Sequence, residues 1–298
     1  MKTMNILKNV AVVVVVAAAT ALIGGCKTER PTYEGPDYIM FSAKSHTLGV
    51  LDKEEWFEIP ICATCTTDHD RLIGVEVIAE QSNAIEGLHY ILESNTLKIE
   101  AGKNTTAVRM RCNPEAMELT DSLGVALRLV IDEQKEWELY GTETEVHMQK
   151  CCPIDLNAFT GYCKITSTWV MQYMGADARL ARTERDPESE NGIIIRDMFY
   201  EGHDIRLTMN TDQRLNPTVE MDTQVLGTTG EAFGTIYGDG KLLMEQPVGY
   251  TSFYNPCETY MVQYVTMFVE GVGTVGTYVN IFEWISDDEA ERILREGF

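Results

Sequence analysis

The chain has 298 residues, with 24 lysines and arginines against 46 aspartates and glutamates, and a formal net charge of −22. Phosphate backbones and anionic lipid headgroups repel such a polyanion, which argues against binding to nucleic acid or to a lipid surface. With 44% hydrophobic residues the chain is able to bury large cores. We therefore expect a folded protein with room for two domains and with neutral or cationic partners.

The N-terminus has the composition of an export signal. Lys2 and Lys8 are followed by an uncharged, mostly apolar run over residues 10–25. The run is shorter than the roughly 20 residues that a helix needs to cross a bilayer. Residues 1–25 are therefore predicted to form a signal peptide that is removed.

The apolar run ends in Gly24 and Gly25, directly before Cys26. This pattern resembles the lipobox of bacterial lipoproteins, in which the cysteine becomes the first mature residue and its sulfur carries a diacylglycerol. The resemblance implies that Cys26 is lipidated and that residues 26–36 are a tether. It also implies a protein held at the cell outer membrane through its N-terminal lipid only. The alternative is an ordinary signal peptide with a coincidental cysteine.

The first half of the chain alternates apolar and polar residues with period two, which predicts half-buried strands separated by turns. The predicted strands are 37–43, 55–62, 72–80, 89–94, 96–102, 106–112, 125–132 and 144–150. Short strands at this spacing predict a sandwich over residues 37–150.

The second half, residues 151–298, also reads as almost entirely β, apart from a predicted acidic loop at 181–192. Its predicted strands are 164–174, 193–200, 204–210, 218–226, 232–238, 241–247, 259–271 and 276–284. Ser286 and Glu289 have capping-box spacing, which predicts a short C-terminal helix. The fold class is therefore all-β: an immunoglobulin-like sandwich, then a second antiparallel β sandwich or barrel closed by a helix.

Eight cysteines are present, and lipidation of Cys26 leaves seven. An odd number cannot all pair, so at least one free thiol is expected. Cys62 and Cys65 lie in a strand-like segment that does not favour a redox or zinc site. A disulfide from Cys151 or Cys152 to Cys163 or Cys257 is more plausible than a vicinal one.

No motif indicates catalysis. The glycine-rich residues 271–276 formally match a dinucleotide-binding fingerprint, but a strand-like segment follows them, which predicts a hairpin turn instead. The histidines are scattered, and the abundant carboxylates show no defined pair for glycoside hydrolysis. We expect no catalytic residues, no metal site and no cofactor.

Aromatic residues are concentrated in the second half of the chain. They are Trp169, Tyr173, Tyr237, Tyr250, Phe253, Tyr254, Tyr260 and Tyr264. Most are expected to pack within sheets. Tyr250, Phe253 and Tyr254 lie in a predicted loop, where exposed rings stack on sugars, and they are the candidate ligand-binding residues.

Residues 84–130 resemble a Calx-β-type immunoglobulin-like sandwich. Gly87, Tyr90, Ala101, Gly102 and Asp121 match that pattern, whereas His89 stands where calcium-binding members have aspartate. With the lipobox, the chain resembles two-domain surface lipoproteins of gut anaerobes that accompany Sus-type glycan-uptake systems.

This resemblance implies glycan binding or binding at the cell surface. One alternative is a structural or assembly accessory that contacts an outer-membrane protein through a sheet edge and binds no small ligand. A glycoside-active enzyme is a weaker alternative.

Overall fold

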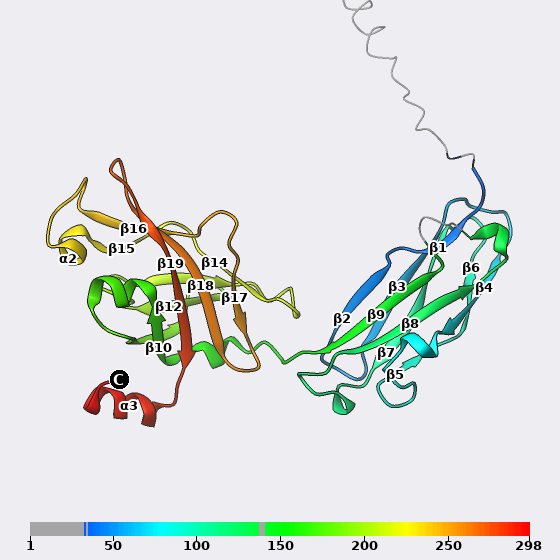
Figure 1. Cartoon of the computed structure of the whole chain (residues 1–298), viewed down its shortest axis with the longest axis horizontal. Helices are drawn as coiled ribbons and strands as arrows, with labels where there is room; N and C mark the ends of the chain where they lie inside the picture. Colours follow the sequence, from blue (N-terminus) through cyan, green and yellow to red (C-terminus); the bar gives the residue numbers. More distant parts are fainter. Residues whose placement is uncertain (1–32, 34, 137–140) are drawn as a thin grey trace, which may run out of the picture.

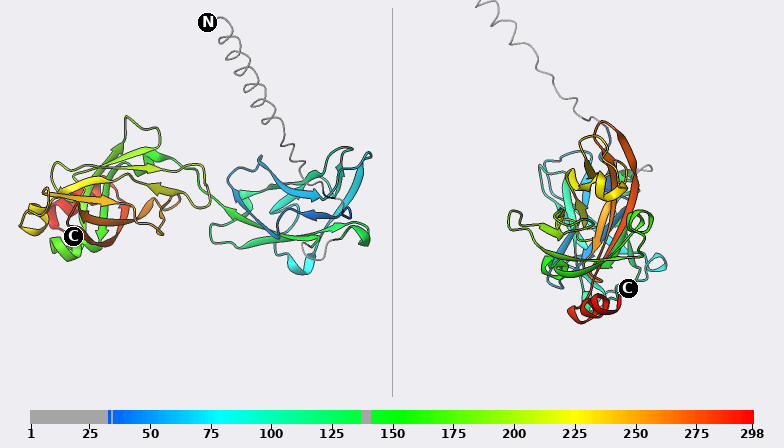
Figure 2. Two further views of the ribbon diagram at one scale, coloured as in Figure 1. Left: turned by 90° about the horizontal axis from the view of Figure 1, so that it is seen from above. Right: turned by 90° about the vertical axis from the view of Figure 1, so that its left-hand side faces the viewer.

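A computed structural model describes residues 33, 35–136 and 141–298. The signal peptide, Cys26 and most of the tether lie outside the described residues. The described chain forms two lobes that lie end to end, a sandwich followed by a barrel (Figures 1 and 2). The chain enters the sandwich at the end remote from the barrel, near β1 (Ile39–Phe41).

The sandwich consists of two antiparallel sheets, apart from one parallel pair between β2 and β9. One sheet has the order β1-β3-β7-β5 and the other β2-β9-β8-β4-β6. Their bounds, after β1, are β2 (Ser45–Val50), β3 (Trp56–Ala63), β4 (Arg71–Val77), β5 (Tyr90–Leu92), β6 (Thr96–Ile99), β7 (Thr105–Cys112), β8 (Leu123–Val130) and β9 (Glu143–Lys150). Three short 3-10 helices connect them: η1 (Ala79–Gln81), η2 (Pro114–Ala116) and η3 (Glu133–Lys135).

The second lobe is a β-barrel. Its strands are β10 (Gly161–Ser167), β11 (Arg179–Arg185), β12 (Gly192–Arg196), β13 (Ile205–Met209), β14 (Thr218–Glu220), β15 (Gln224–Thr228), β16 (Lys241–Glu245), β17 (Ser252–Asn255), β18 (Tyr260–Val269) and β19 (Gly273–Trp284). The ring closes because β19 pairs with both β10 and β18. Elsewhere the Gln224 side chain bonds to both the N–H and the carbonyl of Arg206, which links β15 to β13.

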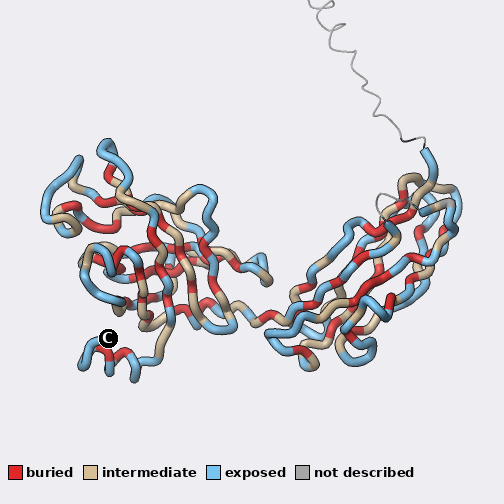
Figure 3. Tube along the Cα trace, viewed as in Figure 1, coloured by how far each residue is buried: buried red, intermediate tan, exposed pale blue. Residues whose placement is uncertain are grey.

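The barrel interior is filled by side chains. Period-two alternation along β18 turns Met261, Val265 and Met267 inward, where all three are fully buried. A buried polar chain crosses the same core: Ser167 Oγ donates to Asn280 Oδ1 (2.6 Å), and Asn280 Nδ2 donates to Gln263 Oε1 (3.0 Å). Buried segments run through the inside of each lobe (Figure 3). A ligand must therefore bind outside the packed core or between the lobes.

The all-β prediction is confirmed, and the second β unit is a barrel. The predicted C-terminal helix is α3 (Asp287–Glu296), whose first turn is capped where Ser286 Oγ accepts the N–H of Glu289 (3.2 Å). The predicted hairpin at residues 271–276 joins β18 to β19, with Gly271 at φ 70°. Left-handed φ of this kind suits glycine.

Several predicted element boundaries are wrong. Residues 232–238 do not form a strand, because Thr228 and Glu231 make a reciprocal capping box that starts α2 (Thr229–Phe233). The predicted strand 164–174 ends at Ser167, whose hydroxyl accepts the N–H of Trp169 (3.1 Å) and starts the helical turn η5 (Val170–Met174). The remaining helical turn, η4 (Leu156–Phe159), lies between β9 and β10.

Three further strands differ from the prediction. β2 was not predicted, β11 runs into the predicted acidic loop 181–192, and the predicted strand 218–226 is divided into β14 and β15. β2 adds to the edge of its sheet by parallel pairing with β9, which is a tertiary contact that local alternation does not reveal. Sheet pairing overrides weak local propensity in such strands.

Candidate functional site

The three candidate aromatic residues divide between surface and core. Tyr250 is 54% exposed and Phe253 is 37% exposed, whereas Tyr254 is 1% exposed. Phe253 and Tyr254 lie in β17 and not in a loop, so their side chains point to opposite faces of the sheet. The prediction that Tyr254 offers a ring to a ligand is therefore wrong.

Tyr254 is a core residue of the barrel. Its hydroxyl donates to the carbonyl of Asn210 (3.0 Å), and its ring makes an edge contact with Phe159 at 5.2 Å between centroids. Desolvation raises the pKa of Tyr254 to about 12, which keeps the phenol neutral. Its contribution is to hold β17 on the barrel.

Phe253 belongs to an apolar row on the outside of the barrel. In the sheet register Phe253 pairs with Val262 of β18, and Val262 pairs with Ile281 of β19. Ile281 is 38% exposed, about the same as Phe253. The three strands lie side by side in Figure 1, so their outward side chains form one surface.

A pair of tyrosines lies next to this row. One of them, Tyr264, is two residues after Val262 in β18 and is on the same face of the strand. Tyr250 and Tyr264 have ring centroids 5.3 Å apart with a 37° angle between the planes. The backbone beneath them is held because the N–H of Tyr264 donates to Ser252 Oγ (3.0 Å). We call the surface of Tyr250, Phe253, Val262, Tyr264 and Ile281 the aromatic face.

Polar rows border the aromatic face on both sides. On one side Lys164 Nζ lies 3.0 Å from Glu283 Oε2, and Glu283 pairs in register with Tyr260. On the other side the hydroxyls of Thr266 and Thr277 are 3.0 Å apart. An apolar strip with polar groups along its borders has the chemistry to hold a ligand that is apolar on one face and hydroxylated at its rim.

The aromatic face reaches a cavity at the junction of the two lobes. This junction cavity has a volume of about 510 Å³, within the roughly 300–1,000 Å³ of ordinary ligand pockets. Phe253, Asn255 and Tyr260 line it from the barrel, and Gln149 and Lys150 line it from the end of β9. Phe253 therefore belongs both to the aromatic face and to the cavity.

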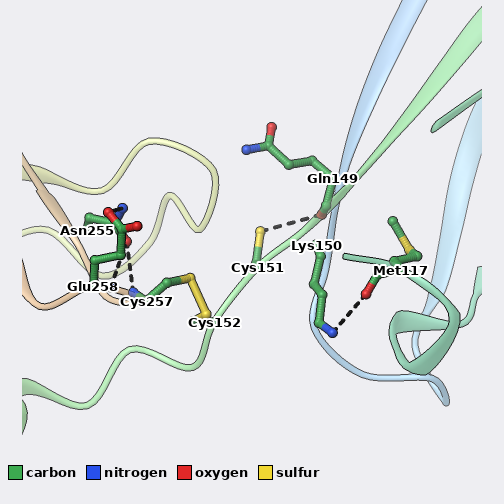
Figure 4. Close-up of a disulfide and its surroundings, with 8 residues drawn as sticks. All are labelled: Met117, Gln149, Lys150, Cys151, Cys152, Asn255, Cys257 and Glu258. Carbon is green, nitrogen blue, oxygen red and sulfur yellow. Dashed lines mark hydrogen bonds between the residues drawn. A yellow bond between two sulfur atoms is a disulfide. The ribbon is translucent and has the colours of Figure 1, made fainter. Parts of the chain in front are cut away.

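A disulfide holds the junction together. Cys152 follows β9 and bonds to Cys257 in the turn between β17 and β18 (Figure 4). This is one of the pairings that the sequence left open, and Cys151 is a free thiol pointing away from the bridge. Burial raises the pKa of the Cys151 thiol, so it stays protonated and unreactive.

Loop contacts reinforce the disulfide. Arg214 Nη1 lies 2.6 Å from Glu55 Oε2, an ion pair between barrel and sandwich. Next to it Leu215 packs so closely on Gly49 that a Cβ atom there would lie 3.2 Å from Leu215 Cγ and 3.1 Å from Cys151 Sγ. The lobes therefore meet through a close-packed contact in addition to the linker.

The turn that carries Cys257 has a strained backbone. Thr259, between Cys257 and Tyr260, has φ 50°, a left-handed value that is rare for a β-branched residue. Strain of this kind persists only where surrounding contacts enforce it, and it is concentrated at functional sites. Here it sets the direction in which the chain enters β18 and places Tyr260 beside the cavity.

No metal centre was found in the described ranges: they contain no group of three or more histidine, cysteine or acidic side chains that could hold a metal ion. His89, at the position of a calcium-ligating aspartate in the Calx-β pattern, uses Nδ1 to accept the N–H of Ile85 (2.9 Å). The same part of the chain contains no helix long and apolar enough to cross a membrane.

Sequence reasoning missed Val262 and Ile281. Both stand at outward positions of strands whose period-two alternation was recognised, so their exposure could have been predicted. Their meeting with Phe253 could not, because it depends on strand register.

Comparisons with known proteins give a family match. Residues 139–296 match the model of a domain of unknown function, DUF4984. No curated protein matches the chain.

Among solved structures, a protein of unknown function from Bacteroides ovatus is 9% identical, with a TM-score of 0.34, covering 82% of this chain and 89% of that one. The apo form of the Calx CBD1 domain is 14% identical, with a TM-score of 0.32 and coverage of 39% and 98%. An auxiliary nutrient binding protein from Bacteroides thetaiotaomicron is 14% identical, with a TM-score of 0.29 and coverage of 84% and 94%.

Proposed function

We propose that this chain, which belongs to the DUF4984 family, is a lipid-anchored binding protein of the cell envelope that holds a glycan on its aromatic face. The observation that carries the proposal is the in-register row of Phe253, Val262 and Ile281 beside the Tyr250–Tyr264 pair. These apolar side chains lie on the outside of a barrel whose own core is complete.

A sugar ring matches this surface chemically. One face of a pyranose presents C–H groups that pack on an aromatic ring, while its hydroxyls project sideways to polar partners. Tyr250 and Phe253 offer exposed rings, and the hydroxyls of Thr266 and Thr277 lie at the border of the face. Aromatic side chains lose little conformational freedom on binding, which makes them effective anchors.

The competing function is that of an assembly accessory that uses the same surface, or a sheet edge, to contact another envelope protein. The two functions differ in the ligand that binds to the isolated soluble protein. A glycan array screened with residues 27–298 separates them. We expect binding to a defined set of polysaccharides, and an array without any binding would reject the proposal.

The binding surface is tested with Tyr250→Ala combined with Phe253→Ala. We expect at least a tenfold loss of affinity for the glycan found on the array, since each truncation removes a stacking ring. Tyr237→Ala is the matched control, because Tyr237 is 46% exposed but packs on Phe233, outside the aromatic face. Equal losses in both variants would show that the aromatic face is not the site.

Anchoring at Cys26 is part of the same proposal. The chain enters the sandwich at the end remote from the barrel, so a lipid upstream would leave the sandwich between the membrane and the barrel that carries the aromatic face (Figure 1). Replacing Cys26 with alanine should abolish labelling by a palmitate analogue and leave the signal peptide uncleaved. Continued acylation of the Cys26→Ala protein would place the anchor elsewhere.

A further inference from the structure

We infer that the junction cavity is the second half of the binding site, so that the ligand is an uncharged glycan chain of several sugar units held by sandwich and barrel together. This inference rests on the function proposed above and specifies the class of ligand. The evidence comes from the continuity, the polarity and the rigidity of the cavity.

Continuity follows from Phe253. Its ring is part of the aromatic face and also lines the cavity. Tyr260 lies two residues before Val262 on β18, on the same face of the strand, and lines the cavity too. A chain stacked on the aromatic face is therefore able to continue into the cavity past Phe253 and Tyr260. A single sugar would occupy only one of these two regions.

Side chains from both lobes supply hydrogen-bonding groups to the cavity. Gln149 is exposed at the end of β9, near Cys151 (Figure 4), and Asn216 is exposed on the barrel side. Their amides carry both donors and acceptors, the combination that suits sugar hydroxyls. Neither amide has a hydrogen bond to another described residue, so both are available to a ligand.

Each charged side chain that lines the cavity has a contact within the protein. Of its charged lining residues, Arg214 pairs with Glu55, Lys150 donates to the carbonyl of Met117 (2.9 Å) and Glu258 approaches Asn255 Nδ2 at 3.5 Å. An acidic sugar would have to compete with Glu55 for Arg214 and approach a chain of net charge −22. A neutral chain meets neither cost.

The cavity is also preorganised. The Cys152–Cys257 disulfide and the close packing of Leu215 on Gly49 fix the two walls before any ligand arrives. Fixed walls reduce the entropy that is lost on binding.

The experiment measures affinity by calorimetry as a function of oligosaccharide length, using residues 27–298. The probes are disaccharides and hexasaccharides prepared from the polysaccharide that binds most tightly on the array. We expect the hexasaccharide to bind at least tenfold more tightly than the disaccharide. We also expect uronic-acid oligomers of the same length to bind at least tenfold more weakly than the neutral hexasaccharide.

Substitutions in the cavity then test whether the tighter binding of the hexasaccharide depends on contacts there. Gln149→Ala and Asn216→Ala should each reduce the advantage of the hexasaccharide at least threefold, and Thr120→Trp, which fills the cavity from an exposed position, should remove it. Asn104→Ala and Thr105→Trp, at exposed positions that do not line the cavity, are the controls. Thermal unfolding of each variant shows whether its fold is intact.

The outcomes separate the two proposals. Equal affinity for short and long chains, unchanged affinity in Thr120→Trp, or preference for an acidic oligomer would overturn the inference while leaving glycan binding on the aromatic face in place. Absence of glycan binding altogether would reject both.

Discussion

Cys152 and Cys257 are joined by a disulfide across 105 residues of sequence, with their Cα atoms 5.3 Å apart. The bridge ties the segment that leaves the sandwich to the turn that enters β18. The bridge thereby adds a covalent cross-link, at the wall of the junction cavity, to the linker, the ion pair and the packing that already join the two lobes.

Removing this bridge should destabilise the barrel. In the double variant Cys152→Ser/Cys257→Ser we expect the free energy of unfolding to fall by about 2–4 kcal/mol, because the unfolded chain regains the freedom of a long loop. Guanidinium denaturation followed by tryptophan fluorescence measures the change. Cys65→Ser, at a partly exposed free thiol, is the control, and a double variant as stable as this control would contradict the structural role of the bridge.

Phe253 and Tyr254 are neighbours in sequence, but one faces outward and the other is buried in the core. Alanine substitution at Tyr254 should reduce stability, whereas alanine substitution at Phe253 should reduce ligand binding. Tyr254→Ala removes a buried ring and should cost about 3–5 kcal/mol of stability, as for other large aromatic truncations. Tyr254→Phe should cost about 1 kcal/mol, through loss of the hydrogen bond to Asn210. Phe253→Ala should change stability by less than about 1 kcal/mol but weaken glycan binding.

Denaturation and calorimetry on the same preparations test this contrast. A Phe253→Ala protein as unstable as Tyr254→Ala would show that Phe253 is a core residue and would remove the principal member of the aromatic face. Unchanged glycan affinity in a stable Phe253→Ala protein would place the ligand elsewhere.

Local sequence patterns were sufficient for the class of the fold and for its longest elements. β18 and β19 show sustained period-two alternation, and Ser286 with the acidic residues behind it indicates the start of α3. In these segments local propensity and tertiary packing favour the same structure, which makes prediction from sequence dependable.

The candidate site was only partly predictable. β17 has four residues between turns, which is too short for its alternation to show which of Phe253 and Tyr254 points outward. The row from Phe253 to Ile281 depends on the register of three strands, and the pairing of Cys152 with Cys257 depends on how the lobes meet. Such long-range relationships are not encoded in any local window of sequence.

The polar chain inside the barrel gives a prediction about stability that is independent of binding. Asn280 is fully buried between Ser167 and Gln263 and bonds to both. Asn280→Ala leaves two buried polar groups without their partner, so we expect a loss of about 2–6 kcal/mol, at about 1–3 kcal/mol for each such group. Thr277→Ala, at an exposed position of the same strand, removes only a solvent-exposed hydrogen bond to Thr266 and should stay within about 1 kcal/mol of the wild type.

Urea denaturation of the two variants measures this difference. If Asn280→Ala were as stable as Thr277→Ala, water would have to reach the barrel interior and replace the amide. Backbone amides of β19 that exchange hydrogen faster in Asn280→Ala than in the wild type would show that the Asn280 side chain stabilises this strand.

Burial should make the free thiols differ in reactivity. Desolvation raises the pKa of Cys112 and of Cys163 to about 12, and only the thiolate is nucleophilic. At pH 8 iodoacetamide should label the partly exposed Cys65 in the native protein and leave Cys112 and Cys163 unmodified until guanidinium is added. Mass spectrometry of tryptic peptides measures each site, and equal labelling rates for Cys65 and Cys163 would contradict this burial.

The same shifts predict a loss of stability at alkaline pH. An unfolded thiol ionises near pH 8.5, whereas the folded Cys163 holds its proton up to a pKa of about 12. Between these values the folded state binds more protons than the unfolded state, so the free energy of unfolding falls as pH rises, by up to about 1.4 kcal/mol per pH unit for each thiol. Denaturation midpoints measured from pH 7.5 to 10.5 should show this slope, and Cys163→Ala should reduce it. An identical slope in the variant would mean that Cys163 ionises equally in both states.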